Sequence, residues 1–434
     1  MKKLLCLVLA LALALSCVSA LAETRTKTPA GQLEGARNVY FVITSAFFKD
    51  GSDIIVLGQK KNDSYKRYDQ PVAITAADDD LLVPVDALSK IFQFDYTYDA
   101  ATGALHLEDE YVKADLTVGS KDVTIDGAAD TLGAAPAEVE GVLCVPAVSV
   151  GTKVFALVTG ESEGYTYLAY EETALPEGST GLSGYITGLT SADKVWGVHN
   201  PVYWYEEAQM LMPYRLTIPT SYDPEVPNAM VIYLHGGSGD DNRDVERMVN
   251  YQDEPGTYWD MLLDEFGFIG LCPNAYAQVD YGKTGRDSDD PNQALAAHLG
   301  EMEVFTVIEE VKAKFNIDES RIFVMGNSMG SGGTTNLATW HPGVFAALSP
   351  SGGAMGSMDV EALGDTPVRM VCGTEDRNYN NALANYKKYL EQGLNVTFRG
   401  VAGGVHSMAW CQPTVLRETF EFFNGVSEDI LNAK

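Results

Sequence analysis

The chain has 434 residues, of which 46% are hydrophobic and 21% charged, an ordinary composition for a packed soluble protein. At roughly 150 residues per domain, this length predicts about two or three domains, each able to bury a core. The formal net charge is -30 at pH 7, so the surface repels nucleic acid and anionic membranes, and we exclude both as partners.

The first residues have the pattern of a secretory signal peptide. Two lysines precede the apolar run Leu4–Leu15, and small residues follow just before position 23. We therefore expect residues 1–22 to be cleaved after Ala22 and the mature protein to be secreted. Cys17 offers the alternative of lipid attachment, but the residues before it fit a lipoprotein site less well. The apolar run is too short to span a bilayer, and we predict no membrane span.

Four cysteines lie outside the signal peptide and are scattered along the chain. They match neither a disulfide framework nor the spacing of a zinc site. One disulfide bridge and four buried thiols both remain open for Cys144, Cys272, Cys372 and Cys411.

Residues 36–170 predict a small α+β domain of short strands and helices. Two segments within it, Leu81–Phe92 and Val142–Phe155, resemble each other. Each is a strand that ends in Val-Pro and continues into a short helix, where proline fits the first turn. The pattern indicates an internal duplication.

This segment resembles the stalk domain, also called the copper amine oxidase N-terminal-like domain, of secreted proteins. The two Val-Pro helices carry the resemblance, together with Tyr98–Thr102, Leu116–Ser120 and Ile125–Gly127. It implies a non-catalytic spacer or a module that associates with the cell wall. Copper is not implied, because His106 stands alone without a cluster of histidine ligands.

Residues 171–184 are rich in glycine, serine, proline and acidic residues, and they predict a linker. From residue 185 to residue 430, strands alternate with helices, which predicts an α/β domain with a doubly wound, mainly parallel sheet. The expected elements are strand Ala229–Leu234, helix Tyr258–Phe266, strand Phe268–Leu271, helix Glu301–Phe315, strand Arg321–Met325, helix Ser331–Trp340, strands Val368–Val371 and Asn395–Phe398, and helix Pro413–Asn424.

The strongest chemical signal is the segment Gly326–Gly330, with the sequence Gly-Asn-Ser-Met-Gly. It lies directly between an apolar strand and a helix, as a nucleophile elbow requires. The residues two before and two after the serine must be small because the turn is very tight. A chance Gly-x-Ser-x-Gly in a loop would lack these flanking elements. The segment therefore predicts Ser328 as a nucleophile.

A second glycine-rich segment, His235–Gly239, follows the strand that ends at Leu234. A turn of this kind can direct a backbone N–H at a substrate carbonyl oxygen and form an oxyanion hole with the N–H of Met329. Gly237 and Ser238 are both candidates for this donor. The alternative of a phosphate loop is disfavoured because the Lys-Ser/Thr ending is missing.

A serine nucleophile needs a base and an orienting acid. His406 is the only histidine that follows the last predicted strand, and a glycine-containing loop leads to it. Asp376 follows the preceding strand in a Gly-x-x-Asp arrangement, and Glu375 beside it is the fallback. The order Ser328, Asp376, His406 is the order that this type of fold uses.

Residues from about 200 to 425 resemble the polyhydroxybutyrate depolymerase/feruloyl esterase branch of the α/β-hydrolases, which is related to esterase D-like proteins. The residues that carry the resemblance are Met212–Pro219, Ile232–Gly237, Phe315–Ile322, Gly326–Gly330 and His341–Ala346. It implies a secreted serine esterase that forms an acyl-enzyme, without metal or organic cofactor, on feruloyl or acetyl esters of plant polysaccharide. Asn327 departs from the family pattern, which more often has a leucine-like residue there.

Three other functions remain open: a secreted serine peptidase of the prolyl-oligopeptidase type, a polyhydroxyalkanoate depolymerase, and a non-catalytic protein that binds cell wall or glycan. Two aromatic residues are candidates for substrate binding, Trp410 just after His406 and Tyr276 near a strand end. An aromatic pocket would suit an aryl or sugar-linked ester, and packing in the core is the alternative for such residues.

Overall fold

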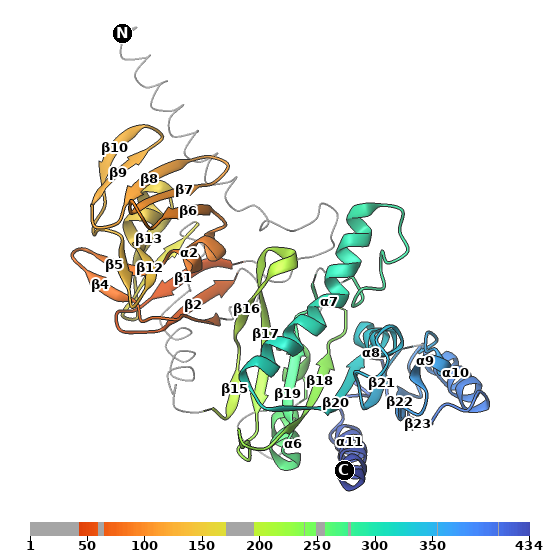
Figure 1. The fold of residues 1–434 in the computed structure, drawn as a ribbon. Coiled ribbons are helices and arrows are strands. Elements are labelled where there is room, and N and C mark those ends of the chain that lie inside the picture. The colour runs from red at the N-terminus through yellow and green to blue at the C-terminus, as the bar shows by residue number, and fades with distance from the viewer. Residues whose placement is uncertain are drawn as a thin grey trace. The chain divides into compact units, whose positions relative to one another are not determined.

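The computed structural model describes residues 43–59, 65–170, 195–237, 239–248, 257–276, 279–353, 355–406 and 408–434 (Figure 1). The predicted signal peptide, the predicted linker at 171–184 and the predicted start of the second domain at 185 lie outside these residues. The described residues form two compact units, one containing residues 43–170 and one containing most of residues 195–434. Within the described residues, no helix has the length and apolar character needed to cross a membrane.

The first unit consists of three antiparallel sheets and short helices. Its sheets have the strand orders β13-β14-β1-β2-β3, β10-β9-β8-β7-β6 and β11-β12-β5-β4. The strands are β1 (Ile43–Phe48), β2 (Ile54–Gln59), β3 (Tyr65–Asp69), β4 (Thr75–Ala77), β5 (Asp80–Pro84), β6 (Asp95–Asp99), β7 (Ala104–Glu108), β8 (Lys113–Thr117), β9 (Asp122–Ile125), β10 (Ala128–Thr131), β11 (Ala137–Val139), β12 (Val142–Pro146), β13 (Val158–Ser162) and β14 (Tyr165–Ala169).

The two Val-Pro segments form equivalent elements, as the sequence predicted. Strand β5 continues into α2 (Val85–Phe92), and β12 continues into α3 (Ala147–Ser149) and a π-helical turn, η1 (Val150–Val154). The two strands pair antiparallel, with Val83 opposite Val145, so the two Val-Pro segments lie side by side. A hairpin follows each helix, β6-β7 after α2 and β13-β14 after η1.

The second unit is built on a nine-stranded sheet with the order β15-β17-β19-β18-β20-β21-β22-β23, and β16 pairs with β17. Strand β17 is antiparallel to β19, and the pairs from β19 to β23 are parallel. The strands are β15 (Gly197–His199), β16 (Val202–Tyr205), β17 (Met210–Ile218), β18 (Asn228–Leu234), β19 (Ile269–Pro273), β20 (Ile317–Asn327), β21 (Ala347–Ser351), β22 (Val368–Gly373) and β23 (Val396–Val401).

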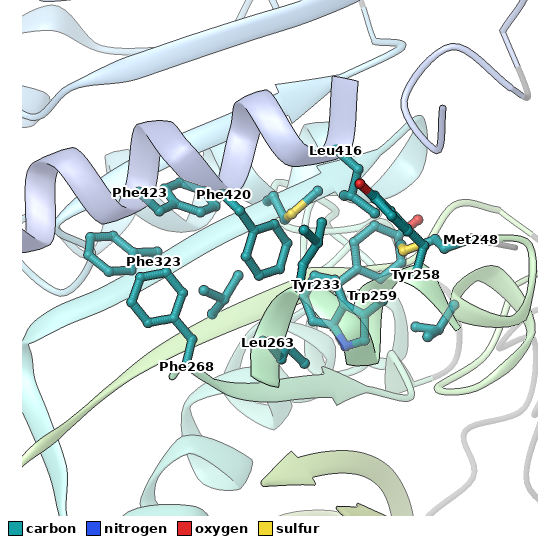
Figure 2. Close-up of a cluster of buried hydrophobic side chains, with 14 of the residues drawn as sticks. Tyr233, Met248, Tyr258, Trp259, Leu263, Phe268, Phe323, Leu416, Phe420 and Phe423 are labelled. Atoms are coloured by element: carbon teal, nitrogen blue, oxygen red, sulfur yellow. The ribbon is translucent and has the colours of Figure 1, made fainter. Parts of the chain in front are cut away.

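Two of the helices, α6 (Tyr258–Phe266) and α11 (Pro413–Ala433), pack on each other and on the sheet. Their apolar side chains form one buried cluster with side chains of β18 and β20, including Trp259, Phe323 and Phe420 (Figure 2). Aromatic rings dominate this core: Phe323 stacks on Phe423, and Trp259 meets Phe420 edge to face. Burial of such rings contributes strongly to stability because each removes a large apolar area from water.

The other helices differ partly from expectation. α7 (Pro291–Lys314) begins ten residues before the predicted Glu301, because Asp290 caps its N-terminus and proline occupies its first position. α8 (Met329–Trp340) begins directly after Ser328. Strand β21 and helix α10 (Tyr379–Glu391) were not predicted, and α11 extends well beyond the expected Asn424.

Candidate active site

Ser328 occupies a sharp turn between β20 and α8. Its backbone angles are φ 56° and ψ -108°, a conformation that non-glycine residues adopt only under strain. The Ser328 N–H donates to the carbonyl oxygen of Ser351, 2.9 Å away on β21, which holds the turn against the sheet. The strained backbone places the side chain at the end of β20, where a nucleophile is presented.

The turn requires glycine at positions 326 and 330, because a side chain at either position would clash with backbone atoms. A Cβ on Gly330 would lie 1.8 Å from the carbonyl oxygen of Leu234, and one on Gly326 would lie 2.4 Å from the carbonyl oxygen of Gly330. Both distances are far inside van der Waals contact. The glycines therefore let the elbow approach the end of β18 closely.

His406 lies in the loop that follows β23. Its Nε2 atom lies 2.9 Å from the Oγ atom of Ser328. The loop is held against the loop after β22: the Glu375 N–H donates to the carbonyl oxygen of Gly404, and the Gly403 N–H donates to the hydroxyl of Thr374. These bonds fix the loop that carries the imidazole beside the elbow.

Asp376 holds the other side of the imidazole ring. Its Oδ2 atom lies 2.9 Å from Nδ1 of His406, and its Oδ1 atom accepts a hydrogen bond from the Asn378 N–H at 2.8 Å. The carboxylate side chain is fully buried. Glu375, the fallback acid, is exposed. The structure thus brings Ser328, His406 and Asp376 into one hydrogen-bonded line and places Asp376, rather than Glu375, against the imidazole.

The thiol of Cys372 lies close to this acid. Burial, followed by the negative charge of Asp376, raises the pKa of Cys372 to about 12. The thiol is therefore neutral at ordinary pH, and it is not an alternative nucleophile. Cys144, Cys272, Cys372 and Cys411 are all buried free thiols, so no disulfide bridge joins them.

The predicted oxyanion donors are backbone N–H groups of the turn after β18 and of the first residue of α8. Met329 is the first residue of α8, where a backbone N–H has no acceptor within its own helix. Gly237 follows β18, and a Cβ at this position would meet no atom within 4 Å, so the space beside it is open. The neighbouring Gly236 N–H is already occupied, because it donates to the Oδ2 atom of Asp244 at 2.7 Å. Ser238 lies outside the described residues.

The two aromatic candidates are buried. Trp410 is 2% exposed, belongs to the core cluster with α6 and α11, and stacks on Tyr233 at 5.3 Å. The expectation that it contacts substrate is therefore corrected: its indole packs in the core. Tyr276 is 3% exposed and meets Tyr205 edge to face, and burial raises its pKa to about 12. Proximity to a strand end in the sequence did not reveal this burial.

The sequence did not single out Asp244 or Glu303, and it pointed to Tyr281 only as one of several aromatic residues near strand ends that could line the site. Asp244 and Tyr281 are buried and bond to the backbone of the glycine-rich turn, while Glu303 is fully buried in α7. They carry no motif, and only the fold brings them to this position. Within the part of the chain that the structure describes, no cluster of histidine, cysteine and acidic side chains is arranged to hold a metal ion.

The strand order of the second unit and the Ser-His-Asp contact place it in the class of α/β-hydrolase folds with a serine triad arrangement. Two family models match the chain. The model of the esterase PHB depolymerase family matches residues 216–373, which include Ser328 but stop short of Asp376 and His406. The model of the copper amine oxidase N-terminal domain matches residues 60–168. Both resemblances drawn from the sequence are thereby confirmed.

Similar proteins include two curated relatives. A bifunctional acetylxylan esterase/xylanase of Neocallimastix patriciarum is 27% identical over 176 residues, which are 40% of this chain and 23% of the relative. A poly(3-hydroxybutyrate) depolymerase of Ralstonia pickettii is 25% identical over 181 residues, 41% of this chain and 34% of the relative. The chain thus matches about a quarter to a third of the length of these relatives. A solved ferulic acid esterase is similar at 17% identity and a TM-score of 0.43, covering 53% of this chain and 98% of its own.

Proposed function

We propose that this protein is a secreted serine carboxylic-ester hydrolase that acts through an acyl-enzyme. The observation that carries the proposal is the line of two 2.9 Å contacts from Ser328 through His406 to a buried Asp376, on a strained elbow. Catalytic serines are recognised by this geometry rather than by their position in the sequence. The similarity to two enzymes named for ester cleavage supports the same reaction class.

In the proposed reaction, the Ser328 hydroxyl attacks the ester carbonyl while His406 Nε2 takes its proton. Asp376 accepts the hydrogen bond from Nδ1, which keeps Nε2 free to act as the base and stabilises the imidazolium cation. The charge on the carbonyl oxygen develops beside the N–H groups of Met329 and Gly237. His406 then returns the proton to the departing alcohol, leaving an acyl group on Ser328.

Water completes the cycle by the same route. His406 takes a proton from water, the resulting hydroxide attacks the acyl carbonyl, and the proton passes to Ser328 as the acid leaves. Each proton that is removed is returned, so the reaction requires no cofactor for its balance.

We further propose that the substrates are feruloyl or acetyl esters of plant polysaccharide. The relative from Neocallimastix patriciarum is named for acetylxylan, and the chain has a predicted signal for secretion. Two apolar side chains flank the proposed base: Val405 is 42% exposed and Met408 is 46% exposed. Exposed apolar groups beside His406 would favour the aryl or methylated part of an ester over a charged group.

The first test is hydrolysis of p-nitrophenyl acetate, p-nitrophenyl butyrate and methyl ferulate by the mature protein and by Ser328→Ala. We expect activity in the wild type and a loss on the order of a million-fold in kcat for the variant. Ser331→Ala is a matched control, because it removes a buried hydroxyl one turn further along the same helix. Activity that survives in Ser328→Ala would contradict the assigned nucleophile.

The substrate class is tested separately with feruloylated arabinoxylan and acetylated xylan, and the released ferulate and acetate are measured. Release from at least one polymer at a rate comparable to methyl ferulate supports the polysaccharide assignment. Cleavage of small esters without release from either polymer would contradict it and leave the reaction class intact. Cleavage of a succinyl-Gly-Pro anilide instead would indicate a peptidase.

For the first unit, we propose the role of a non-catalytic spacer that associates with the cell wall. The support is the match of residues 60–168 to the copper amine oxidase N-terminal domain model. We expect the full chain and its Ser328→Ala variant to sediment equally with purified bacterial cell wall. Equal recovery in the supernatant with and without cell wall would contradict this role.

A further inference from the structure

The glycine-rich turn after β18 is held by buried side chains from three parts of the second unit. The Gly236 N–H donates to Asp244, 2.7 Å away at the start of the short helix α5 (Arg243–Glu246). The Tyr281 hydroxyl donates to the carbonyl oxygen of His235 at 3.1 Å. The His235 ring lies between two carbonyl oxygens, with Nε2 2.8 Å from that of Asn274 after β19 and Nδ1 2.8 Å from that of Gly236. All three side chains are buried.

These contacts determine which backbone N–H of the turn is available to bind an oxyanion. Gly236 cannot act as an oxyanion donor because its N–H is directed at the Asp244 carboxylate. The carbonyl oxygen of Gly236 is also engaged, since it accepts the Gly239 N–H at 2.9 Å. The next N–H along the chain belongs to Gly237, which borders open space. Fixing the peptide on one side of Gly237 fixes the direction of its N–H.

We propose that Asp244, assisted by Tyr281 and His235, is a positioning residue for the oxyanion hole, and that it sets the Gly237 N–H toward the carbonyl oxygen of the ester. This inference rests on the proposed esterase function. Asp244 touches no reacting atom and acts through the backbone of Gly236. An oxyanion donor is most effective when it is held in place before the charge develops, because no free energy is then needed to reorient it during the reaction.

Two further side chains contact the Asp244 carboxylate and hold it in place. Arg247 lies 3.3 Å from Oδ1, and the Tyr233 hydroxyl lies 3.4 Å from Oδ2. The bond to Gly236 uses the oxygen that Tyr233 also approaches. An asparagine at this position keeps one acceptor oxygen, whereas an alanine removes both. The pair of variants therefore separates loss of the acceptor from loss of the charge.

The magnitude follows from what an oxyanion donor contributes. Removing one donor outright typically lowers kcat by roughly 100-fold to 1,000-fold. Asp244→Ala misdirects a donor without removing it, so we expect kcat for p-nitrophenyl acetate to fall by about 10-fold to 100-fold, with KM nearly unchanged. Tyr281→Phe removes one hydroxyl and should lower kcat by about 3-fold to 10-fold. Asp244→Asn should recover most of the loss.

The decisive measurement is the inhibition constant of an aryl trifluoromethyl ketone, which forms a tetrahedral oxyanion adduct with the serine. If Asp244 positions the oxyanion hole, this constant should rise in Asp244→Ala by the same factor by which kcat/KM falls. Active sites are counted by titration with a fluorophosphonate, so that unfolded protein does not enter the comparison. Asp318→Ala is the matched control, because Asp318 is a buried aspartate near the opposite end of β20.

The outcomes separate the two proposals. A proportional change in both constants for Asp244→Ala, absent in Asp318→Ala, supports the positioning role. An active wild type with unchanged kcat and inhibition constant in Asp244→Ala and Tyr281→Phe overturns the positioning role and leaves the esterase proposal standing. A wild type that neither hydrolyses esters nor reacts with the fluorophosphonate overturns both.

Discussion

Glu303 provides a direct test of how burial controls charge in the second unit. Its carboxyl is fully buried in α7, and neither oxygen has a well-aligned hydrogen bond. Burial raises the pKa of Glu303 from 4.5 to about 8, although backbone N–H groups from Asn274 to Tyr276 oppose the rise and the charge of Asp241 adds to it. The hydroxyls of Tyr203, Tyr205 and Tyr281 face the same region. We predict that the free energy of unfolding of the Glu303→Gln variant rises relative to that of the wild type as the pH increases.

The size of the effect follows from proton linkage. Between pH 4.5 and about 8, the unfolded chain has released this proton and the folded protein still holds it, so raising the pH favours unfolding. The window is 8 minus 4.5, or about 3.5 pH units, and each unit corresponds to about 1.36 kcal/mol. The ceiling is therefore about 5 kcal/mol in the free energy of unfolding. Glutamine cannot ionise, so the variant escapes this penalty.

Urea unfolding at pH 5, 6, 7 and 8 measures the difference between Glu303→Gln and the wild type. Tryptophan fluorescence suits the assay because all five tryptophans lie in residues 195–434 and report on the second unit. We expect the difference to move in favour of the variant by about 1 kcal/mol per pH unit. Glu310→Gln on the same helix is the control, since Glu310 pairs with Lys314 at the surface. A difference that is flat from pH 5 to 8 would refute the reasoning.

Three further predictions concern the elbow, the acid and the sheet end. Gly330→Ala should lower stability by at least about 3 kcal/mol, because its Cβ would meet the carbonyl oxygen of Leu234, and a normal melting temperature would contradict this. Asp376→Asn should lower kcat for p-nitrophenyl acetate by about 10,000-fold while Glu375→Gln retains it, and equal losses would reject this assignment. Burial alone would raise the pKa of Asp318, but hydrogen bonds and ion pairs lower it. Asp318→Asn should therefore lose roughly 2 kcal/mol at pH 7, and urea unfolding should show this gap closing as the pH falls below about 4, where the unfolded chain takes up a proton that the folded carboxylate, with its lowered pKa, still resists.

The sequence located the groups around Ser328 because their positions depend on local constraints. A tight turn needs Gly326 and Gly330, and parallel strands bring their carboxyl ends to one edge of a sheet. Once the strands before Ser328, Asp376 and His406 were recognised, their proximity followed from topology. The functions assigned to these residues remain predictions until the variants are measured.

Other features could not be predicted because they depend on tertiary packing. Trp410 lies only four residues from His406, yet the chain turns its indole into the core against Tyr233. Asp244 and Tyr281 lie far apart in sequence and meet at one turn only because β18 and the segment after β19 are neighbours. No spacing rule links such residues, since their contacts arise from how separate elements pack.

The duplication in the first unit also has features that depend on tertiary packing and could not be predicted from the sequence. If the first repeat is taken as β1–β7 and the second as β8–β14, the sequence revealed the Val-Pro helix of each repeat, but not that the hairpin of each repeat pairs with strands of the other. The hairpin β6-β7 of the first repeat extends the sheet of β8, β9 and β10, and the hairpin β13-β14 of the second extends the sheet of β1, β2 and β3. Either repeat alone would expose unpaired strand edges in its sheet. The buried carboxylate of Asp80 in β5 also accepts hydrogen bonds from Val148 and Ser149, so the start of the second repeat's helix depends on the first repeat. Each repeat therefore supplies contacts that complete the other.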